Sequence, residues 1–235
     1  MQVEITHRPS YAHLVVELAT GETIVAEPGA MVSHSPSVSI ETGSSGDGLL
    51  GTASSMLGGE SAFANEFTAE GESGTVTLSP PTPGDIHHHE LNGETLYAVD
   101  GAYLASDPDI DIDSDFGGLE SMLSGASLTP LALNGTGSVF IETFGGIETI
   151  DLDHGESYVV DNDHVVAWES SVEFDARRVG GLASTVLSGE GLVMEFTGPG
   201  TVWYQTRGLD TFTESIVEAM PGTGEDDGGG FNIEF

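Results

Sequence analysis

Short runs in which apolar and polar residues alternate cover most of the chain, and glycine, proline, asparagine or aspartate separates them. Alternation over four to eight residues, rich in Val, Ile, Thr and Tyr, is typical of β-strands that bury one face. The clearest runs are 13–18, 37–41, 86–91, 109–113, 147–152 and 171–175. The pattern therefore predicts an all-β fold.

These runs recur three times in the same order. Each copy has an alternating strand, a hairpin that starts at Gly-Glu, a further strand, a Gly-Leu segment and a closing strand after a glycine-rich turn. The hairpins are "GETIVAEPGAMVS" (21–33), "GETLYAVDGAYLAS" (93–106) and "GESYVVDNDHVVA" (155–167), and the closing strands lie in 67–79, 133–143 and 196–206. We expect one all-β domain (1–220) made of three similar sandwiches or small barrels, at about 10–80, 84–143 and 145–207.

The hairpins share one position at which the turn needs an unusual backbone. Gly29 and Gly101 occupy it in the first two copies, and Asp163 occupies it in the third. Gly and Asp both tolerate a positive φ. We therefore expect a positive φ at all three positions. Glycines 135, 137, 198 and 200 are expected at turns or bulges where backbones pass closely.

Two segments depart from the repeat. Residues 43–66 form an insertion in the first copy, where Leu49, Leu50, Met56 and Leu57 give a short helix one apolar side. Such a helix either caps an open end of the β structure or docks a partner. The tail 221–235 is glycine-rich and acidic, so we expect it to be flexible, although its apolar end could dock on a neighbour.

With these segments defined, the chain resembles the altered-inheritance-of-mitochondria (number twenty-four) type family of uncharacterised proteins. The resemblance runs in order from Pro9 to Leu209 and rests on "PSYAHLVVEL" (9–18), "GETIVAEPGAMV" (21–32), "GGESAFANEFTAEG" (58–71), "PPTPGDIHHHEL" (80–91), "LNGTGSVFIETFG" (133–145) and "GPGTVWYQTRGL" (198–209). It implies three fused modules of the tryptophan-RNA-attenuator-like fold, each a small sandwich or short double-stranded β-helix, and a homotrimer that forms a nine-module ring. It implies no catalytic residue.

Charge sets this sequence apart from an ordinary domain. It has 4 basic residues, all arginine, and 39 acidic ones, for a formal net charge of −35. At molar salt the Debye length falls to about 3 Å, so dense surface charge repels itself little and keeps a protein hydrated. We interpret the composition as that of a halophilic protein. The chain has no cysteine, no apparent signal peptide and no apolar run long enough to span a membrane, so we expect a cytoplasmic protein.

The pattern closest to an enzyme site is His87-x-His89 followed by Glu94, which is the spacing of the first metal motif of cupins. Imidazole and carboxylate groups suit Zn, Fe or Mn. The other copies argue against a metal site, because Glu22 and Glu156 occupy the place of Glu94 in hairpins that lack the histidine pair. The simpler interpretation is an exposed polar strand face, with a cupin-like metal or small-molecule site as the alternative.

A second acidic motif has the spacing of a calcium loop. Asp109, Asp111, Asp113 and Glu120 fit that spacing, but Ser114 stands where the loop needs glycine. The corresponding segments of the other copies are alternating strands. We therefore expect Ile110 and Ile112 to face the core and the aspartates to face solvent.

The remaining signals favour a scaffold over an enzyme. The sequence has no Gly-x-Ser-x-Gly elbow and no phosphate-binding loop. An RNA-binding ring is a second alternative, with bases stacked on Trp203 or Tyr204, but four arginines provide no basic footprint. We expect a non-enzymatic, oligomeric β scaffold that binds protein or membrane-associated partners and has no cofactor. We expect its head-to-tail contact to include Val202, Trp203 and Tyr204.

Overall fold

The structure is a computed structural model that describes residues 1–43, 64–99, 101–113, 130–178 and 192–220. Its strands are β1 (Gln2–Thr6), β2 (His13–Leu18), β3 (Thr23–Ala26), β4 (Met31–His34), β5 (Val38–Gly43), β6 (Ala64–Ala69), β7 (Gly74–Leu78), β8 (Ile86–Val99), β9 (Tyr103–Ser106), β10 (Asp111–Asp113), β11 (Pro130–Glu142), β12 (Ile147–Leu152), β13 (Ser157–Asp161), β14 (Val165–Glu169), β15 (Glu173–Arg178), β16 (Leu192–Thr197) and β17 (Gly200–Gln205). A short 3-10 helix, η1 (Asn162–His164), and one α-helix, α4 (Leu209–Ala219), complete the described elements. The predicted all-β class is confirmed, and each run named above forms all or part of a strand.

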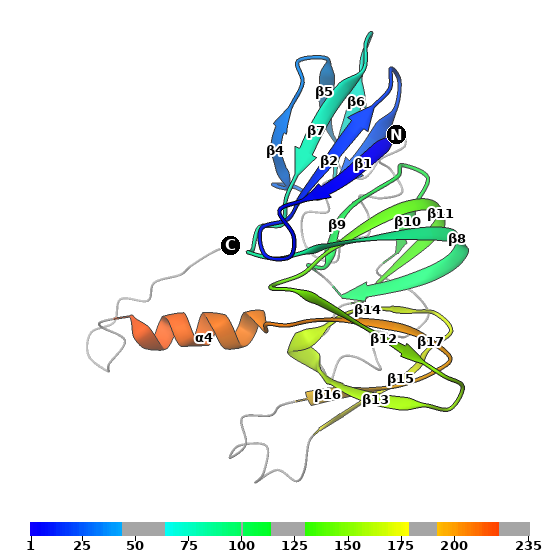
Figure 1. Cartoon of the computed structure of the whole chain (residues 1–235), viewed down its shortest axis with the longest axis vertical. Coiled ribbons are helices and arrows are strands. Elements are labelled where there is room, and N and C mark those ends of the chain that lie inside the picture. The colour runs from blue at the N-terminus through cyan, green and yellow to red at the C-terminus, as the bar shows by residue number, and fades with distance from the viewer. Residues whose placement is uncertain (44–63, 100, 114–129, 179–191, 221–235) are drawn as a thin grey trace.

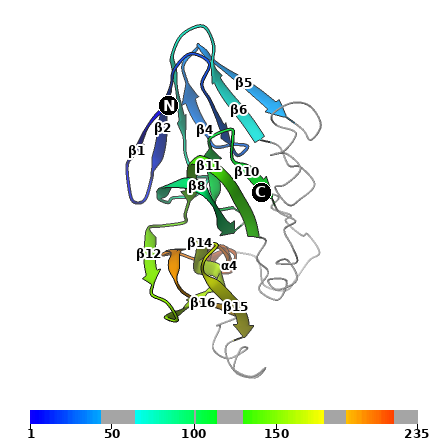
Figure 2. The same ribbon diagram turned by 90° about the vertical axis from the view of Figure 1, so that its right-hand side faces the viewer.

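The strands follow one another as a stack. Figures 1 and 2 show β1–β7 at the top, β8–β11 in the middle and β12–β17 below, with α4 projecting from one side. We call residues 1–80 the first segment, residues 84–143 the second segment and residues 145–207 the third segment. One large sheet runs through all three in the order β12-β17-β14-β8-β11-β9-β3-β6-β5. Smaller sheets, β1-β2-β7-β4 and β13-β16-β15, lie at the two ends.

Corresponding strands in the three segments make corresponding pairs. The pairs β4·β7, β9·β11 and β14·β17 are all antiparallel, and each has a register irregularity at the same place, between Met31 and Ser33, at Ile141, and between Val165 and Ala167. In the second segment, β8 and β11 are long strands that continue through what are two separate strands in the other segments. This shared pairing makes positions in different segments directly comparable.

Glycines allow β11 to bend within the second segment. Its register with β8 shifts between Asn134 and Thr136, and Gly135 and Gly137 have φ of 142° and 140°. A Cβ added at Gly135 would lie 2.8 Å from the carbonyl oxygen of Asp109, and one added at Gly137 would lie 2.6 Å from the Asp107 carboxylate. The expected close approach of backbones is confirmed at Gly135 and at Gly198, where an added Cβ would lie 2.6 Å from the Asp153 carbonyl oxygen, whereas Gly137 and Gly200 approach side chains.

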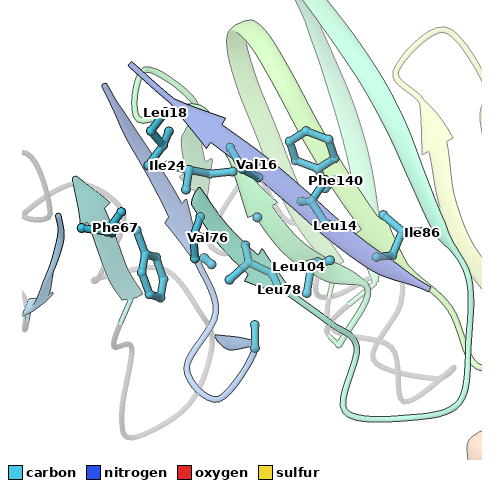
Figure 3. Packing of buried hydrophobic residues seen from close by; sticks show 14 of the residues in the cluster. Leu14, Val16, Leu18, Ile24, Phe67, Val76, Leu78, Ile86, Leu104 and Phe140 are labelled. Atoms are coloured by element: carbon cyan, nitrogen blue, oxygen red, sulfur yellow. The ribbon is translucent and has the colours of Figure 1, made fainter. Parts of the chain in front are cut away.

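The core consists of clusters that are joined across the segments by aromatic side chains. Phe140 of the second segment packs in the cluster of the first, beside Leu14 and Val16 (Figure 3). Trp203 of the third segment packs in the cluster of the second. Since Phe140 and Trp203 hold corresponding positions in β11 and β17, both internal junctions use the same packing.

The hairpin prediction is confirmed for two positions and wrong for the third. Gly29 and Gly101 have φ of 90° and 78°. Asp163 instead lies in η1, and its carboxylate accepts hydrogen bonds from the backbone N–H groups of Asp210 (3.2 Å) and Thr211 (3.3 Å) and from the Thr211 hydroxyl (3.1 Å). Asp163 is therefore explained by attachment of the start of α4, not by backbone freedom.

Some predicted features lie outside the described residues. They are residues 44–63 of the insertion, which include Leu49, Leu50, Met56 and Leu57, the tail 221–235, and Ser114 and Glu120 of the acidic motif.

Replacing Gly101 by valine should destabilise the protein by more than about 1 kcal/mol, because a β-branched residue strongly disfavours a positive φ. Chemical denaturation measures the change. Gly101→Asn is the matched control, since Asn tolerates this conformation, and it should cost clearly less. Equal losses of stability in both variants would show that the added side chain, and not the positive φ, causes the loss.

Candidate functional site

The histidine pair lies at the junction between the second and third segments. The rings of His87 and His89 lie 5.1 Å and 5.3 Å from the Trp203 ring, centroid to centroid. His88 points the other way and stacks on Phe140 at 4.7 Å. All three histidines are half-buried, so the expectation of an exposed polar face is wrong. The reason is that Trp203 covers His87 and His89 at the positions that correspond to Leu14 and Val16.

Glu94 belongs to the hairpin turn. Its Oε2 accepts a hydrogen bond from the backbone N–H of Asn92 at 3.1 Å, as Glu22 does from Ala19 (2.8 Å) and Glu156 from Asp153 (3.0 Å). The predicted turn role of these glutamates is confirmed. In the part of the chain that the structure describes, no three His, Asp or Glu side chains gather closely enough to hold a metal ion. The trio His87, His89 and Glu94 is therefore not brought together.

Burial suppresses the charge of the histidine pair. It lowers the pKa of His87 to about 4, with smaller contributions from the neighbouring cations, and it also lowers the pKa of His89. The Nε2 atom of His87 is buried without a hydrogen-bond partner. Both rings are neutral at pH 7 and act there as packing groups against Trp203.

The acidic motif at 109–113 and the closing strand with Val202 and Trp203 also contribute side chains to the core. Ile110 and Ile112 are buried and Asp109 and Asp111 are exposed, which confirms the predicted orientation of this strand. Trp203 is buried in the core and presents no free face for a base, whereas Tyr204 is half-buried. Val202 is buried as well, so the expectation that Val202 and Trp203 form a contact between chains is wrong.

The two junctions inside the chain share one backbone arrangement. At the first, β9 of the second segment pairs with β3 of the first, with Ser106 opposite Val25 and Ala105 opposite Ala26. At the second, β14 of the third segment pairs with β8, with Trp168 opposite Tyr97 and Ala167 opposite Ala98. These pairs occupy corresponding positions, so the register is the same. The bridging strand is buried in both cases.

The same strands recur at the ends of the stack without this partner. Strand β4 corresponds to β9 and β14, but among the described strands it pairs with β7 alone. Strand β13 corresponds to β3, and among those strands it pairs with β16 alone. Met31 (40%) and Val32 (49%) of β4 are exposed, whereas the corresponding Tyr103 and Leu104 of β9 are 2% and 0% exposed. Tyr158 (46%) and Val159 (43%) of β13 are exposed where Ile24 and Val25 are buried.

These two strands, which we call the end edges, are the candidate functional site. They combine a backbone edge that no other described strand pairs with and exposed apolar side chains, and such edges readily pair with another chain. The sequence reasoning missed them because it looked for the contact in the closing strand. Position-by-position comparison of the three hairpins would have found them, because Val32 and Val159 each align with junction residues.

Three comparisons with known proteins each find a match over most of the chain. A family model described as mitochondrial biogenesis AIM24 matches residues 3–207. An uncharacterised protein from Streptococcus pyogenes serotype M6 is 30% identical over 230 residues, which cover 94% of this chain and 92% of that protein. A crystal structure of a Streptococcus pyogenes protein matches with a TM-score of 0.76 and 28% identity, over 93% of this chain and 99% of that one. No helix in the described ranges is long and apolar enough to cross a membrane.

Replacing His87 by leucine, the residue at the corresponding position 14, should make the protein less sensitive to acid. The folded-state pKa of His87, about 4, lies below its unfolded value of about 6.5. The stability that neutral His87 contributes is therefore present above pH 6.5 and is lost as pH falls towards 4. We expect the wild type to lose about 2 kcal/mol more than the variant between pH 7 and pH 5. Denaturation at both pH values measures this.

The matched control is His154→Gln in an exposed turn, which should leave the acid sensitivity unchanged. An identical loss in the His87→Leu variant and the wild type would contradict the assignment.

Proposed function

The chain belongs to the AIM24 family, and from that premise we propose that it is a non-enzymatic scaffold that assembles head to tail, strand β13 of one copy pairing with strand β4 of the next. The observation that carries this proposal is the contrast in burial at corresponding positions. Met31, Val32 and Tyr158 are exposed at the two end edges, whereas the corresponding side chains are buried at both internal junctions. A second copy supplies the missing strand at each end.

The internal junctions specify the register of the contact between copies. When this register is applied to the contact between copies, Val159 of one copy lies opposite His34 of the next and Val160 lies opposite Ser33, in antiparallel orientation. The hydrogen bond from the Glu27 N–H to the Leu104 carbonyl (3.0 Å) corresponds to one from Asp161 to Val32 of the neighbouring copy. The sheet β13-β16-β15 then continues into β4-β7-β2-β1.

The charge of the end edges supports the same contact. Strand β4 contains no acidic residue, and β13 contains only Asp161, in a chain that has 39 acidic residues. Removing two nearly uncharged edges from water costs little desolvation and repels little. The rest of the acidic surface still repels its copies, so assembly needs the screening of molar salt. This dependence fits a halophilic, cytoplasmic protein.

A contact between unlike surfaces either closes into a ring or continues as a filament. We propose closure with three copies, in which three tryptophan-RNA-attenuator-like modules per chain give a ring of nine, as the family resemblance implies. The ring presents its faces to protein or membrane-associated partners. The turn, packing and capping roles of Glu94, His87, His89 and Asp163 support a non-enzymatic role over the cupin-like one.

Light scattering in molar KCl should report about three times the chain mass of 24.4 kDa, and about one chain mass in dilute buffer. Val159→Asp should give the mass of one chain in molar KCl, because it places a charge in every contact. Circular dichroism should show that the variant stays folded.

Ile40→Asp is the matched control, because Ile40 is equally exposed (40%) but lies on β5, outside the proposed contact. It should keep the wild-type mass. A wild-type monomer at every salt concentration, or an assembled Val159→Asp variant, would refute the proposal.

A further inference from the structure

A cavity of about 380 Å³ lies where the three segments meet the start of α4. Glu27, which follows β3, and Glu142, which ends β11, line it together with Asp163 and Asp210. Val99, Phe144, Val165 and Leu209 provide apolar wall. No arginine is among its lining residues, so the polar part of the cavity is entirely anionic or neutral.

The carboxyl group of Glu142 is buried and incompletely bonded. Its residue is 5% exposed, its backbone N–H donates to the Ala102 carbonyl at 2.8 Å, and its side chain is hydrogen-bonded to Glu27. The Oε2 atom has no hydrogen-bond partner in the described structure. Burial, followed by the charge and hydrogen bond of Glu27, raises the pKa of Glu142 to about 10. The carboxyl group of Glu142 is therefore protonated at neutral pH.

The other segments show that the fold does not need this pair. Glu142 corresponds to Ser79, whose N–H donates to the Ala30 carbonyl at the same distance of 2.8 Å, and to Gln205. Both polar atoms of the Gln205 amide have a partner, since Oε1 accepts from the Phe144 N–H (2.8 Å) and Nε2 donates to the Asp163 carbonyl (3.0 Å). Glu27 corresponds to Val99. Gln205 lines the same cavity as a neutral side chain, whereas Glu142 keeps an oxygen without a hydrogen-bond partner in the described structure.

We propose that this cavity binds a small primary ammonium compound, whose charged end lies between Glu27 and Glu142 and whose apolar body lies against Val99, Phe144 and Val165. An ammonium group has three N–H donors, so it can satisfy Oε2 of Glu142 and bond to Glu27 at the same time. Its charge replaces the proton of Glu142, which leaves to the solvent, and both carboxylates then pair with the cation. The inference does not depend on assembly between copies.

Isothermal titration with n-butylamine at pH 8 tests the proposed binding, in the salt that keeps the protein folded. Two buffers of different ionisation enthalpy are used, because their comparison gives the number of protons released. We expect saturable binding of one butylammonium per chain, with release of about one proton, because the amine is already charged at this pH and Glu142 is not. Glu142→Gln should weaken binding at least about tenfold and abolish proton release, since it removes the second charge. n-Butanol, which has a similar body but no charge, should not bind.

Glu156→Gln, in an exposed turn of the third segment, is the matched control and should bind like the wild type. If Glu142→Gln does not fold, the half-buried Glu27→Gln serves for affinity: it should also weaken binding at least about tenfold, whereas proton release should persist because burial keeps Glu142 protonated. No saturable binding by the wild type, unchanged affinity in either variant, or unchanged proton release in the Glu142 variant overturns the proposal. Light scattering on the same samples separates this failure from a failure of assembly.

Discussion

A β-strand in the middle of a sheet needs a backbone partner on each side. In this molecule two strands each pair with one strand of their own segment and one strand of the preceding segment. Strand β9 pairs with β3 as well as with β11, and β14 pairs with β8 as well as with β17. Because backbone groups that are buried without a partner are costly, this double pairing fixes how neighbouring segments sit. The large sheet, the buried hairpins and the shape of the stack in Figure 1 all depend on it. The exposure of β4 and β13 depends on it too, because these strands correspond to β9 and β3 but lie at the two ends of the stack, without a neighbouring segment.

Side-chain packing follows from this backbone arrangement. With the register fixed, Phe140 is placed on Leu14 and Val16, and Trp203 is placed on His87 and His89. A histidine pair that has metal-motif spacing in the sequence is thus part of a packing surface. The junction between the first two segments differs in having Glu27 and Glu142 where the next has Val99 and Gln205. Differences between equivalent positions separate what the fold requires from what a site uses.

Much of the fold could be predicted from the sequence, because strand alternation and turn glycines are local. The strands, the turn glutamates, the positive φ of Gly29 and Gly101, and the inward orientation of Ile110 and Ile112 were all accessible in this way. The position of Asp163 was not, because its carboxylate bonds to α4, more than forty residues later. The cover over His87 and His89 and the burial of Val202 and Trp203 depend on long-range pairing that alternation alone does not specify. The site was missed for the same reason, since an edge is defined by the absence of a neighbour in space.

In the proposed assembly, β4 of one copy pairs with β13 of another in the register of the internal junctions. The chain contains no cysteine, so introduced thiols report without background. Opposed residues of an antiparallel pair lie about 5 Å apart, within reach of a disulfide. The most direct measurement mixes the single variants His34→Cys and Val159→Cys in molar KCl under mild oxidation. A covalent dimer should form in the mixture, and little should form in either variant alone. An absence of cross-linking in the mixture, or equally efficient cross-linking of either variant with itself, would contradict it.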